Sequence, residues 1–173
     1  LLGLLQPTDG TAYILGQDIR RSSRDLLMQM GYMSQKFSLY DDLTVVENLR
    51  FFGRSYGLTG KQLHNRMDFV IDMAGLKGHE HTRTSELSGG WAQRLALGAA
   101  IMHHPKLIFL DEPTAGVDPI SRREFWDLLY QLSQDGTTIF VTTHYMDEAE
   151  HCEEVAFIYY GNIIAHGSPS DIV

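Results

Sequence analysis

The sequence predicts an α/β fold in which helices flank a mostly parallel sheet and a helical lobe is inserted into the sheet domain. Lys106–Leu110 is a continuous apolar run typical of a strand covered on both faces, and Thr137–Thr143 reads as a second buried strand. Helical patterns alternate with such strands after Pro105, as they do in βαβ units. Between about residues 44 and 104 the periodicity is helical only.

The elements before the lobe are short. Residues 1–10 resemble the end of a helix that stops at a proline and then turns. A strand is predicted over Thr11–Gly16, a helix over Arg24–Met30 and a second strand over Gly31–Ser34, which ends at Gln35. The chain therefore enters the sheet before it reaches the lobe.

The inserted lobe begins with a helix-capping pattern. Thr44 and Glu47 have the spacing of a capping box, in which the two side chains satisfy reciprocal backbone N–H groups. Apolar residues then recur at helical spacing and predict amphipathic helices, at Val45, Leu49, Phe52, Tyr56, Leu63, Met67, Val70, Ile71 and Ala74. We expect one domain, with a core of residues 1–37 and 101–173 and a lobe over about 38–100.

The chain returns to strand and helix alternation after the lobe. Ile120–Ser133 is predicted to form a helix, Tyr145–His151 another, and Val155–Tyr160 a strand that turns at Gly161. These elements complete the α/β pattern.

Composition limits the classes of function. The 173 residues are 43% hydrophobic and 21% charged, which is enough to bury a sizeable core. The net charge of −8 argues against a nucleic-acid or anionic-membrane binder, because these proteins need clustered Lys and Arg. One cysteine, Cys152, permits no internal disulfide, and no run approaches the roughly 20 apolar residues of a membrane span. We expect a cytoplasmic protein whose membrane role, if any, goes through a partner.

Polar residues follow three predicted strands. Gln35 follows the first, Asp111 and Glu112 the second, and His144 the third. Ligands of open parallel sheets bind beyond the carboxyl ends of the strands, so these groups are expected to converge on one site. Asp111 suits Mg²⁺, and Glu112 suits the activation of an attacking water. Gln35 could hold Mg²⁺ or that water, and His144 could contact a phosphate.

Each of these residues also has a structural interpretation. An isolated Asp-Glu pair before Pro113 reads as a solvated acidic turn, and a lone histidine or glutamine at a strand end is often an ordinary loop residue. The coincidence of three strand ends favours the functional interpretation.

Ser88, Gly89 and Gly90 precede an apolar helical run and are predicted to open a helix. The serine would supply a capping hydroxyl, while the glycines and the free N–H groups would make an anion site. The bare tripeptide is only a flexible helix start. Leu87 before it, and Gln93 and Arg94 after it, favour the anion site.

The printed sequence lacks a phosphate-binding lysine loop of the form G-x-x-x-x-G-K-[ST]. Its one Gly-Lys pair, Gly60-Lys61, is followed by Gln62, and Ser55 stands where the pattern requires its first glycine. The chain has no initiator Met. We expect a fragment that starts just after such a loop.

Five motifs in order resemble the nucleotide-binding domain of ABC transporters. They are the Q-loop glutamine Gln35, the signature Leu87–Gln93, the Walker B strand Leu107–Glu112, the D-loop Ala115–Asp118 and the switch histidine His144. Trp91 departs from the glutamine commonest at its position. Residues 143–150 are similar to the exporter branch that includes multidrug-type ATPases.

The resemblance implies a P-loop NTPase-type core whose N-terminal part is missing, with ATP and Mg²⁺ as cofactors. Two such domains would pair head to tail, so that Ser88, Gly89 and Gly90, together with Gln93 and Asp118, bind the nucleotide. Residues after Gln35, with the lobe, would receive a transmembrane permease domain, which places the chain on the inner face of the cell membrane. No nucleic-acid partner is expected.

The expected function is that of an ATP-hydrolysing subunit that powers export, with the fragment itself inactive for lack of the lysine loop. One alternative is a translation-associated ABC ATPase, which usually carries two cassettes in one chain. Another is an assembly module that does not hydrolyse ATP. A DNA-repair member is disfavoured, because residues 44–86 leave no room for a long coiled coil.

Overall fold

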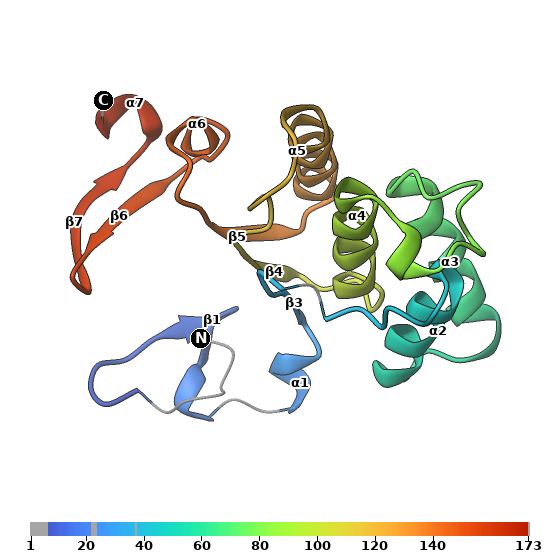
Figure 1. Ribbon diagram of the computed structural model, residues 1–173. Coiled ribbons are helices and arrows are strands. Elements are labelled where there is room, and N and C mark those ends of the chain that lie inside the picture. The colour runs from blue at the N-terminus through green and yellow to red at the C-terminus, as the bar shows by residue number, and fades with distance from the viewer. Residues whose placement is uncertain (1–6, 22–23, 37, 173) are drawn as a thin grey trace. The chain divides into compact units, whose positions relative to one another are not determined.

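The computed structural model describes residues 7–21, 24–36 and 38–172. The chain divides into two compact units, of which the first ends at Val141 and the second begins at Thr142. Figure 1 labels the elements of both units.

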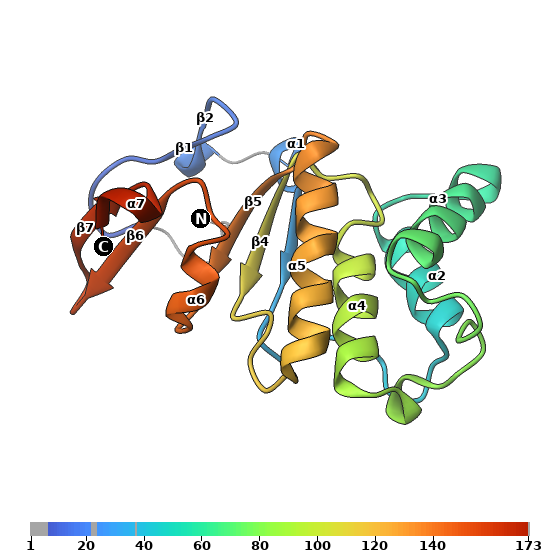
Figure 2. The same cartoon turned by 90° about the horizontal axis from the view of Figure 1, so that it is seen from above.

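Among the described residues, the larger sheet of the first unit has three strands in the order β3-β4-β5. These are β3 (Met30–Met33), β4 (Leu107–Asp111) and β5 (Thr138–Thr142). β3 and β4 pair in parallel, with Met30 opposite Leu107, and the arrows of β4 and β5 point the same way in Figure 2. The predicted parallel sheet is confirmed.

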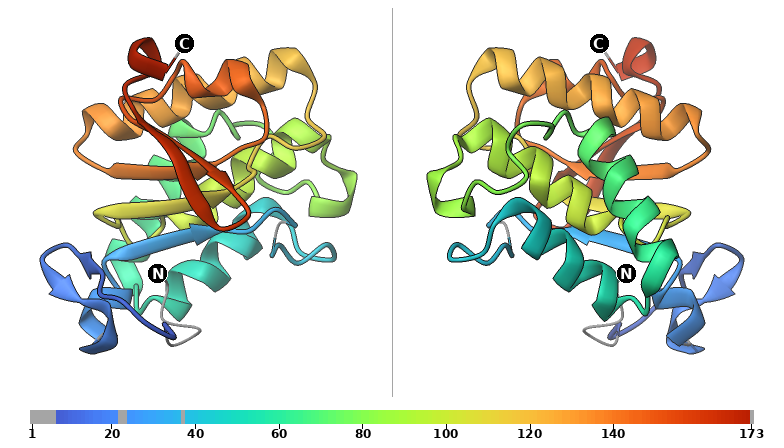
Figure 3. Two further views of the ribbon diagram at one scale, coloured as in Figure 1. Left: turned by 90° about the vertical axis from the view of Figure 1, so that its left-hand side faces the viewer. Right: turned by 90° about the vertical axis from the view of Figure 1, so that its right-hand side faces the viewer.

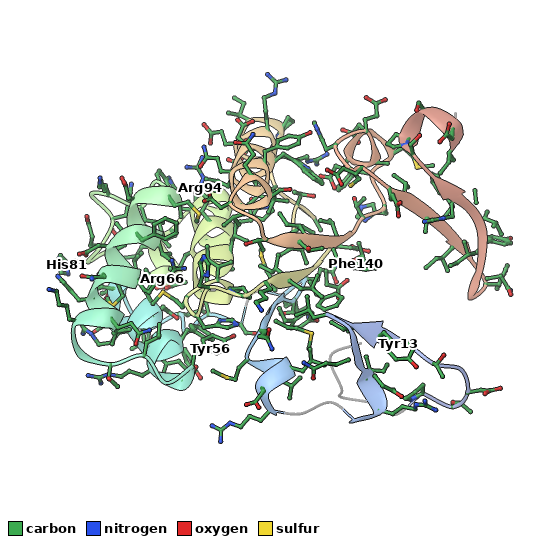
Figure 4. The ribbon with its side chains drawn as sticks, turned by 180° about the vertical axis from the view of Figure 1, so that it is seen from behind. Tyr13, Tyr56, Arg66, His81, Arg94 and Phe140 are labelled. Atoms are coloured by element: carbon green, nitrogen blue, oxygen red, sulfur yellow. The ribbon has the colours of Figure 1, made fainter. Side chains whose placement is uncertain are left out.

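The two strands predicted to be buried differ. In β4, Leu107–Leu110 are all buried, as the continuous apolar run predicted. β5 alternates between exposed and half-buried residues, and Phe140 is 49% exposed (Figure 4). The prediction of a second buried strand is therefore wrong. β5 is the last strand in the order of this sheet, and an apolar run does not reveal whether both of its faces are covered.

Two long helices pack beside the sheet. α4 (Gly89–Ala100) and α5 (Pro119–Gln134) run side by side, and α4 also contacts β3 (Figure 2). α5 starts with a proline in its first turn, where the missing N–H costs no hydrogen bond. It buries one apolar face, made of Phe125, Trp126, Leu128, Leu129 and Leu132.

The helical region contains α2 (Val45–Ser55), α3 (Gly60–Met73) and the 3-10 turn η2 (Thr84–Glu86). The predicted capping box is confirmed, since Glu47 N donates to Thr44 Oγ1 over 3.4 Å and Thr44 N donates to Glu47 Oε2 over 2.8 Å. α4 packs both on α2 and on β3, so the predicted lobe boundaries at about 38 and 100 stay a prediction.

The first described residues form a small hairpin instead of one strand. β1 (Tyr13–Ile14) and β2 (Gln17–Asp18) pair antiparallel around Leu15 and Gly16, which have φ of 49° and 76°. After the 3-10 turn η1 (Ile19–Arg21), α1 spans only Arg24–Leu27, because Met30 already belongs to β3. The predicted helix end over residues 1–10 falls largely outside the described residues.

The second unit contains α6 (Met146–Ala149), β6 (Val155–Tyr159), β7 (Asn162–Gly167) and α7 (Pro169–Ile172). β6 and β7 form an antiparallel hairpin, drawn in red in Figure 3. Its turn residues Tyr160 and Gly161 have positive φ, so the predicted turn at Gly161 is confirmed.

Candidate active site

The end of β4 carries an unusual backbone conformation. Asp111 is the exposed last residue of the strand, and Glu112 after it has a φ of 45°. Positive φ is costly for a residue with a side chain, and the following Pro113 restricts Glu112 further. Such strain persists where neighbouring groups hold it and is common at functional sites.

Gln35 provides one such support. It follows β3, the sheet neighbour of β4, and its Nε2 donates to Glu112 Oε2 over 2.8 Å. The structure thus brings two of the predicted site residues into direct contact at the carboxyl edge of the sheet. An amide donor at this distance orients the carboxylate.

His144 belongs to the second unit. Its ring packs on that of Tyr145, with centroids 4.2 Å apart. The loop around it is fixed by Thr143, whose Oγ1 donates to Glu148 Oε2 over 2.6 Å and accepts from Tyr145 N over 3.0 Å. The meeting of His144 with Gln35 and Glu112 stays a prediction.

The glycine-rich segment starts α4, as predicted. Ser88 occupies the N-cap position, but its side chain makes no capping hydrogen bond, so the predicted capping hydroxyl is wrong. Ser88 and Gly89 are exposed, and a Cβ added to Gly89 would meet no heavy atom within 4 Å. The start of α4 at Ser88 and Gly89 is therefore accessible to an anion, whereas Gly90 is buried.

Gly90 has a packing role. A Cβ at this position would lie 2.5 Å from Ser121 Oγ and 2.8 Å from Ser121 Cβ. Gly90 thus lets the start of α4 approach the start of α5 closely.

Gln93 is fully buried, with 0% of its surface exposed. Its Nε2 donates to the Pro113 carbonyl over 2.6 Å, and its Oε1 has no hydrogen-bond partner among the described residues. This burial does not suit the direct nucleotide contact expected of Gln93.

Asp118 caps α5. Its Oδ1 accepts from Ser121 N over 3.0 Å and from Ile120 N over 3.1 Å. These bonds, first of all the one from the Ser121 backbone, hold the pKa of the Asp118 carboxyl below its usual range. If Asp118 also binds nucleotide, as expected, it does so in addition to capping α5.

The lowered pKa of Asp118 predicts a pH-dependent stability. Because the folded-state pKa lies below the unfolded one, the stabilisation by the carboxylate is present above about pH 4 and is lost as pH falls through the folded-state pKa. Asp118→Asn keeps the cap acceptor, so its Tm deficit should shrink from pH 7 to pH 3. Asp118→Ala should retain a deficit across this range. Thermal unfolding at several pH values checks this, and a constant Asn deficit would contradict it.

Comparison with known proteins decides the family. The family profile described as "ABC transporter" matches residues 1–115. The chain belongs to the ABC transporter family. The resemblance drawn from the five motifs is thereby confirmed.

Two similar proteins are named as ATP-binding proteins. The chain is 48% identical over 172 residues to the probable multidrug ABC transporter ATP-binding protein YbhF of Escherichia coli, covering 99% of this chain and 30% of the relative. It is 37% identical to the Nod factor export ATP-binding protein I of Cupriavidus metallidurans, covering all of this chain and 57% of that protein. The chain thus spans 30% of the first relative and 57% of the second.

Solved ABC structures have the same fold. CbiO1 from Clostridium perfringens, part of the ABC transporter complex cbiONQ, matches with a TM-score of 0.89 at 27% identity, over 99% of this chain and 70% of that one. The cassette MJ0796, solved as a dimer in a post-hydrolysis state with ADP and Pi, matches with a TM-score of 0.82 at 26% identity, over 97% and 77% of the two chains. The predicted P-loop NTPase-type fold is confirmed.

The described part of the chain offers few side-chain ligands for Mg²⁺. Among the described residues no three His, Cys, Asp or Glu side chains gather into a metal site. Asp111 and Gln35, the predicted ligands, fit an ion that keeps several waters and shares substrate phosphates, which is the usual habit of Mg²⁺. Within the same residues, no helix has the length and apolarity to cross a membrane.

Sequence reasoning missed a contact between two side chains of α4, Trp91 and Arg94, and His79 of the segment after α3. The ring centroids of Trp91 and His79 lie 4.4 Å apart, and the guanidinium carbon of Arg94 lies 5.0 Å from the centroid of the Trp91 ring. Arg94, labelled in Figure 4, also pairs with Glu124 of α5. The spacing of Trp91 and Arg94, three apart on a helix, was the available signal.

Proposed function

We propose that this chain is part of an ATP-hydrolysing subunit that powers export of a substrate through a membrane-spanning partner. The proposal rests above all on the hydrogen bond between Gln35 and Glu112, which joins the ends of two neighbouring parallel strands. The contact orients the Glu112 carboxylate at the carboxyl ends of the parallel strands, where folds of this kind bind their ligands.

In the proposed reaction, Glu112 accepts a proton from, or polarises, the water that attacks the γ-phosphate of ATP. Gln35 holds the carboxylate in place, and His144 contacts the γ-phosphate. Asp111 would hold Mg²⁺, which when bound neutralises charge on the phosphates. The exposure of Asp111 and the geometry of Gln35 support these roles.

The active assembly is proposed to be a head-to-tail pair of such domains. Ser88, Gly89 and Gly90 of one copy would bind the phosphates held by the other. The exposure of Ser88 and Gly89 and the open space at Gly89 support this role. The solved dimer of the similar cassette MJ0796 is consistent with pairing.

A membrane-spanning partner is proposed to dock on aromatic residues of α2 and of the segment before it. The ring of Tyr40 lies 4.7 Å from that of Phe51, which lies 5.4 Å from that of Phe52. Tyr40 is 46% exposed and Phe51 is 45% exposed. A partly exposed aromatic cluster suits a protein partner, and docking there would hold the chain at the cytoplasmic face of the membrane.

The isolated chain and the assembled transporter are expected to differ in ATP binding and hydrolysis. The assembly should bind and hydrolyse ATP. The isolated 173 residues, whose sequence contains no lysine loop, should show no saturable binding at the same ATP concentrations. Titration calorimetry measures the binding of ATP, and phosphate release measures its hydrolysis. Tight stoichiometric binding by the isolated chain would contradict the assignment of the phosphate grip to a lysine loop.

A further inference from the structure

The burial of Gln93 is unfavourable for the stability of the fold. Its amide is fully buried and only one of its two polar atoms has a partner among the described residues. A buried acceptor left without a hydrogen bond destabilises a fold, whereas an apolar side chain of the same size would not. Stability alone therefore does not explain a glutamine here.

The partner of Gln93 lies at the strained turn. Pro113 follows Glu112, whose φ is 45°, and has no N–H of its own. Its carbonyl is the one hydrogen-bonding group of the Pro113 backbone, and Gln93 Nε2 donates to it over 2.6 Å. Glu112 O accepts from Ala115 N over 3.1 Å on the other side. The bond from Gln93 thus fixes the turn that aims Glu112.

The other end of this link is the glycine-rich start of α4. Gly90 stands three residues before Gln93 on the same helix, so both lie on one face. Gly90 is packed against Ser121, and Arg94 pairs with Glu124, so this part of α4 is fastened to α5 as well. A displacement at Gly89 or Gly90 would move Gln93 with it, since a helix is rigid over one turn.

We propose that Gln93 is a positioning residue that fixes the Glu112–Pro113 turn relative to the glycine-rich end of α4. Phosphate contact at that end is thereby coupled to the orientation of Glu112 in the same chain. This inference rests on the proposed ATPase function, in which Glu112 activates water.

Gln93→Met tests the link, because methionine has similar volume and neither donates nor leaves an amide oxygen unpaired. In the assembled ATPase, kcat should fall about 10- to 100-fold while KM for ATP changes less than about twofold. Tm should change little, because the variant removes the unpaired Gln93 Oε1 but also leaves the Pro113 carbonyl without its donor. Hydrogen exchange should be faster at Ala115 N and Val117 N, which donate to Glu112 O and Thr114 O. Gln131→Met, on the exposed side of α5, is the matched control and should change none of these.

The outcomes separate this inference from the proposed function. An unchanged kcat for Gln93→Met, in an assembly where Glu112→Gln stops hydrolysis, overturns the positioning role and leaves the ATPase assignment intact. A lower Tm with normal kcat makes Gln93 a packing residue only. If Glu112→Gln leaves hydrolysis intact, the catalytic assignment fails, and unchanged exchange at Ala115 and Val117 would overturn the link as well.

Discussion

Glu112→Gln should reduce ATP hydrolysis by the assembled ATPase by about 100- to 10,000-fold, the usual range for loss of a general base. The glutamine side chain has the same shape and keeps an oxygen that can accept from Gln35 Nε2, which now donates to Glu112 Oε2 over 2.8 Å. The turn should therefore keep its conformation while the proton acceptor is lost. ATP binding should remain, as measured by nucleotide titration beside steady-state phosphate release.

The matched control is Glu153→Gln, the same chemical change at an exposed acid of the second unit. It should hydrolyse ATP at the unmodified rate. Hydrolysis retained by the Glu112 variant would place the water-activating group elsewhere, with Asp111 and His144 the next residues to substitute. Loss of ATP binding together with hydrolysis would instead indicate that the turn had collapsed.

The part of the fold that sequence could predict is the part set by local chemistry. The capping box at Thr44 and Glu47 needs only residues three apart, and the structure contains both of its hydrogen bonds. The apolar run before Asp111 predicted β4, because four buried residues in succession suit a strand with covered faces. The contact of Gln35 with Glu112 followed from the rule that parallel strands end at one edge.

The rest depends on contacts between distant segments. The bond from Gln93 to Pro113 spans 20 residues, and nothing in the local pattern distinguishes a buried glutamine from one that faces a ligand. The exposure of Phe140 in β5 depends on which elements cover the sheet, not on its apolar neighbours. Ser88 has the residue type of a cap, but its rotamer makes no capping bond. Burial and side-chain direction are tertiary properties.

Gly31→Ala should lower the free energy of unfolding by about 2 kcal/mol, the middle of the range for overpacked sites. Gly31 lies in β3 against the end of α4, where an added Cβ would be 2.6 Å from Ala100 O, 3.2 Å from Pro105 Cγ and 3.3 Å from Ile108 Cγ1. The nearest atom is a backbone carbonyl, so no rotamer change can relieve the clash. For a chain of this length the loss corresponds to roughly 4–8 °C in Tm.

Gly89→Ala is the control for stability, because its added Cβ would meet no heavy atom within 4 Å and its φ is not positive. The Tm of that variant should be equal to or slightly above that of the unsubstituted chain. Gly31→Ala should also slow hydrolysis in the assembled ATPase, since β3 must move away from α4 and carries Gln35 just beyond its end. A Tm equal to that of the unsubstituted chain would mean that β3 and α4 are not in close contact, and the support of Glu112 by Gln35 would then lack its structural basis.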